Sequence, residues 1–246
     1  MKKVIAAVLL SSVLTAGMAA ADATYQTLPF SQNWTNAAQI TVNDDWSGVP
    51  GILGYLGNND LASVTGRVSC TIVGDSTTAV DVIANLVNPN TVTNGGVGEF
   101  DVIPNPTIAL QGSGTADFPN IQLHLDTRCF NNVTVAGNLR DIDGSTDNSI
   151  QSIAIQYRVG TTGSWSNLQC FSDVTTGPSL AVAVTPFSVV LPVAAENQPQ
   201  VQVRVLTTNA VGNDEWVGVD DISVTGTVCP VPTITTTWGA IKNRQN

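Results

Sequence analysis

Two adjacent carboxylates, Asp220 and Asp221, lie in the middle of an alternating apolar segment, residues 216–226. Neighbouring side chains of a β-strand point to opposite faces, so Asp220 is expected on the face of Trp216 and Asp221 on the other. At least one acid then emerges among apolar side chains, where it needs an arginine, backbone N–H groups or a cation. Ca²⁺ prefers such oxygen ligands, so we expect a structural calcium site here.

The alternative is that the strand bends or ends at this point. Both acids would then reach water or Arg204, which we expect on the neighbouring strand.

A second acidic cluster, Asp141, Asp143 and Asp147 with Gly144, has the density of a cation-binding loop. Its spacing does not match the EF-hand order, which needs a glycine at the sixth position and a glutamate at the twelfth. Aspartate and glycine also form turns, so a solvated hairpin loop is the alternative to a metal site.

Asp45 and Trp46 are the candidate ligand-binding residues. An aromatic face can stack on the C–H surface of a sugar while a neighbouring carboxylate accepts bonds from its hydroxyls. Aromatic residues of a β-sandwich mostly pack in the core, however, so we expect at most one or two of the tryptophans 34, 46, 165 and 216 at a ligand surface.

No catalytic set is recognisable, and we expect no enzyme. The one histidine, His124, lies on the polar face of an alternating strand and is predicted to face solvent. No nucleophile motif such as Gly-x-Ser-x-Gly accompanies it. A paired-carboxylate mechanism needs two acids at a set separation in space, which the sequence does not reveal.

The N-terminus predicts export. Lys2 and Lys3 precede an apolar run and then small residues, the order of a secretory signal peptide, which we end at Ala21. Without Lys2 and Lys3, seven basic residues stand against 19 acidic ones, a net charge of −12. This charge argues against nucleic acid and anionic lipid as partners. We expect a protein that is secreted or periplasmic, without membrane insertion.

Four cysteines, Cys70, Cys129, Cys170 and Cys229, follow the leader. In an oxidising compartment they predict two disulfides with three open connectivities. The alternative is free, buried thiols.

Short alternating segments separated by turn residues predict an all-β fold, an antiparallel β-sandwich. The clearest are residues 121–125, 133–135, 153–159, 187–191 and 201–205. Residues 201–208 and 216–226 are expected to form a hairpin. We divide the chain into a signal peptide (1–21), one sandwich domain (22–228) and an extended Pro- and Thr-rich tail (229–246).

Two segments carry a family resemblance. Residues 156–165 end in a Gly-rich turn before Trp165, and residues 216–224 have the closing form apolar-Asp-Asp-apolar. Together they resemble secreted bacterial jelly-roll modules of the carbohydrate-binding, MAM-like and cleaved-adhesin types, which have a galactose-binding-like fold. Residues 28–226 also resemble an uncharacterised extracellular domain found attached to secreted nucleases, through residues 45–51, 139–144 and 209–216.

The resemblance implies a jelly-roll fold with Asp220 or Asp221 as a calcium ligand. It favours a non-catalytic module that binds polysaccharide or a cell-surface glycan. The alternative function is a structural or self-assembling surface protein, because an extended tail can add a strand to the sheet edge of another copy and form a homo-oligomer.

Overall fold

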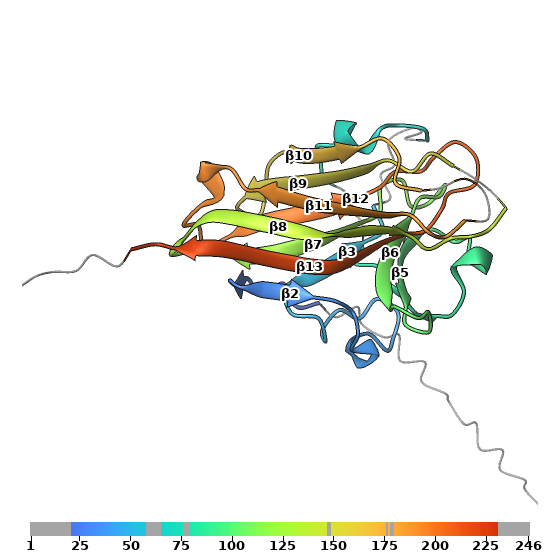
Figure 1. Ribbon diagram of the computed structural model, residues 1–246, viewed down its shortest axis with the longest axis horizontal. Coiled ribbons are helices and arrows are strands. Elements are labelled where there is room, and N and C mark those ends of the chain that lie inside the picture. Colours follow the sequence, from blue (N-terminus) through green and yellow to red (C-terminus); the bar gives the residue numbers. More distant parts are fainter. Residues whose placement is uncertain are drawn as a thin grey trace, which may run out of the picture.

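The computed structural model describes residues 21–57, 65–75, 79–146, 149–175, 177 and 180–230. These residues form a jelly-roll β-sandwich, as predicted, in which two sheets lie face to face (Figure 1). Nearly all strand pairs are antiparallel, and β1–β7 and β4–β5 are two short parallel pairings. Among the described residues the remaining regular structure is four 3₁₀ turns: Ala37–Gln39, Ser69–Thr71, Pro89–Thr91 and Val193–Ala195.

The first sheet has the order β1-β7-β12-β9-β10, with β3 also paired to β7. Its strands are β1 (Gln26–Thr27), β3 (Ile52–Tyr55), β7 (Asn120–Asp126), β9 (Ile153–Val159), β10 (Ser166–Phe171) and β12 (Val201–Leu206). The second sheet has the order β11-β8-β13-β6-β5-β4, with β2 also paired to β13. Its strands are β2 (Phe30–Gln32), β4 (Ile83–Leu86), β5 (Gly96–Phe100), β6 (Thr107–Gln111), β8 (Phe130–Asp141), β11 (Val184–Val190) and β13 (Val217–Val228).

Alternation along the strands builds the core between the sheets. Every second residue of a strand faces inward, and at these positions the sequence places β-branched and leucine side chains. Full burial of each such side chain stabilises the fold by about 1.5–3 kcal/mol. The central inward residues are Ile121, Leu123 and Leu125 on β7, Val201, Val203 and Val205 on β12, and Val133, Val135 and Leu139 on β8.

The outer face of the first sheet is polar but covered. The loop around Ile72 and Gly74 lies on it, and both carbonyls accept hydrogen bonds from the guanidinium of Arg204. His124 on the same face is 3 % exposed and contacts the ring of Tyr25 edge-on at 5.3 Å. Burial lowers the pKa of His124 to about 4. The prediction that His124 faces solvent is therefore wrong, because alternation shows which face a residue is on and not what covers that face.

The predicted hairpin of the last two strands is also wrong. β12 lies between β7 and β9 in the first sheet, whereas β13 lies between β8 and β6 in the second. The connection, residues 207–216, therefore crosses from one sheet to the other at the end of the sandwich where β13 begins (Figure 1).

One disulfide, Cys70–Cys170, joins the turn Ser69–Thr71 to β10 with a Cα–Cα distance of 6.0 Å. Cys129 and Cys229 are free. The predicted leader, apart from Ala21, and the tail from residue 231 lie outside the described residues. In the described part of the chain, no helix is long and apolar enough to cross a membrane.

Candidate functional site

The acid pair on β13 sits at a β-bulge. Asp220 pairs with Asn138 of β8 and Ser223 pairs with Ala136, so β13 has one more residue than β8 between these pairs. Asp221 adopts the left-handed backbone conformation, with a φ of 50°. An extra residue of this kind interrupts the hydrogen-bonding ladder and reverses the alternation beyond it.

The bulge changes which side chains share a face. Val219 before it and Ile222 after it both pack in the core, three positions apart. Asp220 therefore points to the outer face, where it is fully buried, and Asp221 is exposed. The strict alternation expected from the sequence is wrong at this one point.

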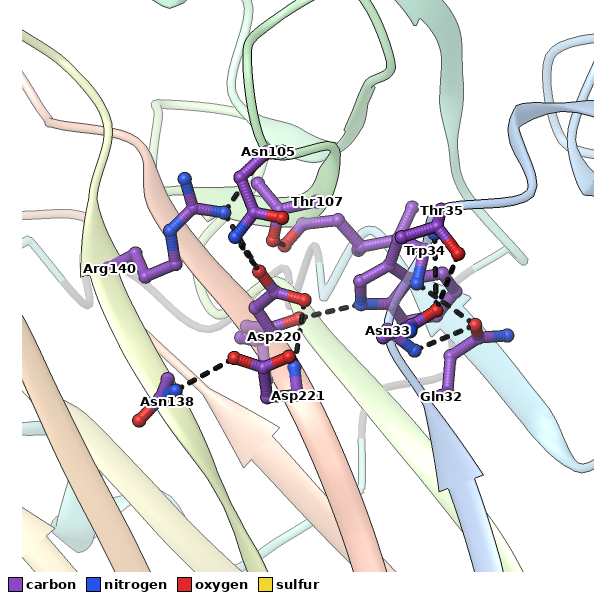
Figure 2. Close-up of polar contacts among 12 residues, drawn as sticks. Gln32, Asn33, Trp34, Thr35, Asn105, Thr107, Asn138, Arg140, Asp220 and Asp221 are labelled. Carbon is purple, nitrogen blue, oxygen red and sulfur yellow. Dashed lines mark hydrogen bonds and ion pairs between the residues drawn. The ribbon is translucent and has the colours of Figure 1, made fainter.

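An arginine neutralises Asp220 (Figure 2). Its Oδ2 accepts hydrogen bonds from Arg140 Nη1 and from Asn105 Nδ2, each at 2.8 Å. Its Oδ1 accepts the backbone N–H of Asp221 at 2.7 Å. Loss of solvation raises the pKa of Asp220, and the N–H of Asp221 and the guanidinium of Arg140 oppose that rise.

Asp221 has a different environment. Its carboxylate accepts a hydrogen bond from Asn138 Nδ2 at 2.9 Å (Figure 2). The side chain is otherwise exposed to solvent. Arg204, the alternative partner considered for these acids, lies on β12 in the other sheet.

The donor set around Asp220 does not fit a calcium ion. Both carboxylate oxygens already accept bonds from N–H groups, and one of these belongs to a cation that would repel Ca²⁺. Among the described residues, no three His, Cys, Asp or Glu side chains gather as a metal site would require. Calcium at Asp220 or Asp221 stays a prediction from the sequence.

The second acidic cluster does not adjoin Asp220 and Asp221, because it lies at the end of β8, beside the start of β13. Asp141 ends β8 and pairs with Val217, and both Asp141 and Asp143 are buried. Their Oδ1 atoms accept backbone N–H groups two residues ahead, at 3.2 Å from Asp143 and 3.0 Å from Ser145. These are turn-forming bonds. Asp147 lies outside the described residues, and metal binding by this loop stays a prediction.

Trp46 lies in the core, where its Nε1 donates to the carbonyl of Asp81 at 3.0 Å and its ring meets Trp34 edge-on. This burial leaves no face for a sugar, which argues against the predicted stacking role. The Oδ1 of Asp45 accepts the N–H of Ser47 at 2.9 Å and so stabilises a turn. The other three tryptophans considered for a ligand surface are buried as well: Trp34, Trp165 and Trp216.

A polar pocket of about 390 Å³ lies at the end of the sandwich where β13 begins. This loop pocket, as we call it, was not found by sequence analysis. It is lined by the end of β6 and the turn that follows it, by the β12–β13 connection, and by Thr93, which lies before β5. The lining residues are Thr93, Gln111, Gly112, Ser113, Gly114, Asn209, Gly212, Asn213 and Asp214.

Hydrogen bonds between these segments fix the shape of the loop pocket. Asp214 Oδ1 accepts the N–H of Ala210 at 2.7 Å and Gln151 Nε2 at 2.9 Å. Gln111 Nε2 donates to the carbonyl of Asp214 at 2.8 Å, while its Oε1 accepts the N–H of Gly95 at 3.1 Å. These bonds hold the polar groups of the loop pocket in fixed positions.

Gly112 is required for this close approach. A Cβ atom at this position would lie 2.4 Å from Asn209 Cα and 2.5 Å from Asp214 Oδ1. Burial raises the pKa of Asp214 to about 6, although the N–H of Ala210 stabilises its charged form. The carboxylate is thus ionised at neutral pH and becomes protonated in mild acid.

The segments that line the loop pocket can be recognised in the sequence, but their proximity in space cannot. Gly112-Ser-Gly114 and residues 209–215 read as ordinary turns. They come together because β6 pairs with β13, with Leu110 opposite Val217. That pairing links residues about 100 positions apart, which no local pattern reveals.

No protein-family model matches the chain. No curated protein matches it either. Similar solved structures include a carbohydrate-binding module, CBM28, specific for non-crystalline cellulose, at 9% identity and a TM-score of 0.38, covering 58% of this chain and 96% of that one. The K3 cleaved adhesin domain of Lys-gingipain from Porphyromonas gingivalis has 11% identity and a TM-score of 0.36, covering 50% and 75%.

A Stig cyclase from Fischerella sp. TAU is also similar, at 14% identity and a TM-score of 0.43, covering 82% of this chain and 100% of that one. With TM-scores below 0.5, none of these likenesses says what this chain binds. The description of the fold rests on its own strands and pairings.

Proposed function

We propose that this protein is an exported, non-catalytic module that binds a neutral glycan in the loop pocket. The observation that carries the proposal is the lining: one carboxylate, three amide side chains and two hydroxyls converge on one cavity together with three glycines. Sugars offer many hydroxyls, each able to donate and accept, and such a lining matches them better than it matches an apolar ligand.

The size of the loop pocket supports the same conclusion. Small-molecule sites usually enclose about 300–1,000 Å³. The loop pocket has about 390 Å³. A second hollow of about 360 Å³ beside Val68, Ile150 and Val211 has a more apolar lining. A polar hollow beside Tyr55 and Arg158 has about 170 Å³. The loop pocket can therefore hold a sugar unit with the rest of a chain outside it.

Charge favours a neutral glycan over a polyanion. The three lysines, at positions 2, 3 and 242, all lie outside the described residues. Three of the arginines, Arg128, Arg140 and Arg158, form ion pairs with aspartates, and Arg204 is buried. Without Lys2 and Lys3, the exported chain has a net charge of −12 and would repel nucleic acid and acidic polysaccharides.

The lining also supports binding without catalysis. Asp214 is the one carboxylate among the described residues that line the loop pocket. Glycoside hydrolysis by the usual route needs a second carboxyl across the bond that is cleaved. The disulfide Cys70–Cys170 supports export, because such bonds persist in oxidising compartments.

Affinity electrophoresis and calorimetry against soluble neutral polysaccharides, with polygalacturonate and heparin alongside, test the proposal. We expect retention by at least one neutral glycan and none by the polyanions. Thr93→Val removes a hydroxyl from the lining while keeping its shape, and Asn213→Ala removes an exposed amide. Each lost hydrogen bond of about 1 kcal/mol should weaken binding roughly five-fold.

Thr162→Val is the matched control, since Thr162 is an exposed turn residue that does not line the loop pocket. Its affinity should equal that of the wild type. The proposal is rejected if none of the neutral glycans retains the protein. It is also rejected if the Thr93→Val and Asn213→Ala variants bind as tightly as the Thr162→Val control.

A further inference from the structure

The two free cysteines meet at the end of the sandwich opposite the loop pocket. Val228, the last residue of β13, pairs with Phe130, the first residue of β8. The next pair outward is Cys229 opposite Cys129. The backbone N–H of Cys229 donates to the carbonyl of Cys129 at 2.8 Å, so the two backbones are in contact.

This alignment depends on a second irregularity that compensates for the bulge at Asp221. Between Thr225 and Thr227 on β13 the register shifts again, and here β8 has the extra residue. Asn132 on β8 adopts a positive φ of 49° in this stretch. The two strands thereby return to their original register before the cysteines, and a single bulge would leave the cysteines one position out of step.

The hydrogen bond between the two backbones places the cysteines within reach of a disulfide, and Cys129 has a left-handed backbone conformation with a φ of 65°. Directly opposed residues of an antiparallel pair have Cα atoms about 4.5–5.5 Å apart. Disulfides span Cα–Cα distances of about 4.4–6.8 Å. Cys129 is exposed and Cys229 half-buried, so an oxidant can reach them. The thiol of Cys229 lies 3.3 Å from Asn131 Oδ1, which holds it beside β8.

The backbone of Cys129 is held from a second direction. Its N–H donates to Asn197 Oδ1 at 3.0 Å, and the N–H of Asn132 donates to Glu196 Oε1 at 2.7 Å. The turn before β12 therefore fixes the first residues of β8. The backbones that a disulfide would join are therefore already held against each other.

We propose that Cys129 and Cys229 form a second, reversible disulfide that fastens the end of β13 to the start of β8. The thiolate of one cysteine attacks an exchange-competent disulfide such as oxidised glutathione and releases one glutathione thiolate. The second thiolate then attacks the mixed disulfide and releases the other. The two glutathione thiolates take up the two protons of the protein thiols, so two protein thiols and one glutathione disulfide give one protein disulfide and two molecules of reduced glutathione.

The consequence concerns the end of β13. At its end β13 presents Thr225, Thr227 and Val228 to solvent, so these side chains add little buried contact to its pairing with β8. A disulfide at the next residue prevents this end of β13 from fraying.

Peptide mapping tests the proposal directly. The full chain is equilibrated with oxidised glutathione, alkylated with iodoacetamide under denaturing conditions and digested without reduction. We expect a peptide that links Cys129 to Cys229 beside the Cys70–Cys170 peptide, which is the internal control for oxidation. Alkylation of both Cys129 and Cys229 while Cys70–Cys170 stays linked would overturn the proposal, as would a dimer joined through two Cys129 residues.

Melting curves under the same oxidising conditions give a second readout. A disulfide that closes a loop of this length stabilises by a few kcal/mol, so Cys129→Ser should lower the Tm by about 5–10 °C. Cys229→Ser and the double variant should show the same fall, because all three remove one bond. Circular dichroism checks that the three variants fold normally. If they do and their Tm values equal that of the wild type, the disulfide between Cys129 and Cys229 does not form.

Discussion

At the scale of single residues, Asp220 shows how a buried carboxylate can be satisfied without a metal. Its side chain is fully buried, and Arg140 supplies the opposite charge from the neighbouring strand β8. A charge buried without its partner is costly, because neither water nor another ion replaces the lost interaction. The main effect of the ion pair is therefore that each charge offsets the desolvation cost of burying the other.

Replacement of Arg140 should reveal this dependence. Arg140→Leu leaves the Asp220 carboxylate buried with only amide donors, and we expect the free energy of unfolding to fall by about 3 kcal/mol. Asp221→Asn is the control, since Asp221 is exposed and asparagine tolerates its left-handed backbone, so its effect should stay within about 0.5 kcal/mol. Urea denaturation measures both. Equal effects of the two substitutions would show that Arg140 does not balance Asp220.

If the loop pocket binds a glycan as proposed, the raised pKa of Asp214 predicts that binding depends on pH. The pKa is about 6, so the carboxylate is available to accept hydrogen bonds above that pH and is increasingly protonated below it. We expect the association constant to fall several-fold between pH 7.5 and pH 5. Calorimetry at both values measures the change, and Asp214→Asn should bind more weakly at pH 7.5 and lose the pH dependence. If the affinity of the wild-type protein is the same at pH 5 as at pH 7.5, the Asp214 carboxylate does not contact the ligand.

At the scale of elements, the bulge at Asp221 explains where the pattern of the sequence misleads. The core residues of β13 alternate as Val217 and Val219, then as Ile222 and Val224. The two sets are out of phase by one residue, and the extra residue lies between them. Removing that residue would make the alternation continuous, and removing a residue elsewhere would not.

A pair of single-residue deletions tests this description. Deletion of Asp221 should leave all four core side chains facing inward, so the protein should fold with a loss of about 1–3 kcal/mol. Deletion of Ser223 should turn Val224 outward and prevent folding, because a slip of one residue reverses every following side chain. Circular dichroism and thermal melting distinguish the two. Similar outcomes for both deletions would show that the bulge does not set the phase of β13.

At the scale of the whole molecule, calcium is the remaining question about the acidic residues. Melting curves with and without EDTA address it, because an ion that binds only the folded state raises the Tm. With Arg140 balancing Asp220, we expect chelation to leave the Tm unchanged. A fall of several degrees that added calcium reverses, and that Asp221→Asn abolishes, would instead support the calcium site predicted from the sequence.

Local sequence patterns were enough to predict the class of fold and most of the central strands. Residues 153–159 were predicted as a strand and form β9 with the same bounds, and residues 121–125 lie within β7. Such strands are readable because burial of one face imposes a period of two on the local sequence. The cysteine pairing, by contrast, stayed open among three possibilities, since local order contains no information on which strands become neighbours.

Features that depend on long-range pairing became visible only in the folded chain. It placed β12 and β13 in different sheets, covered His124, assigned Arg140 rather than Arg204 to Asp220, and brought two ordinary turns together as the loop pocket. The physical reason is that a local pattern reports only whether a residue faces inward or outward. Which strands become neighbours, and which loops then meet or cover a face, is set by the packing of the two sheets.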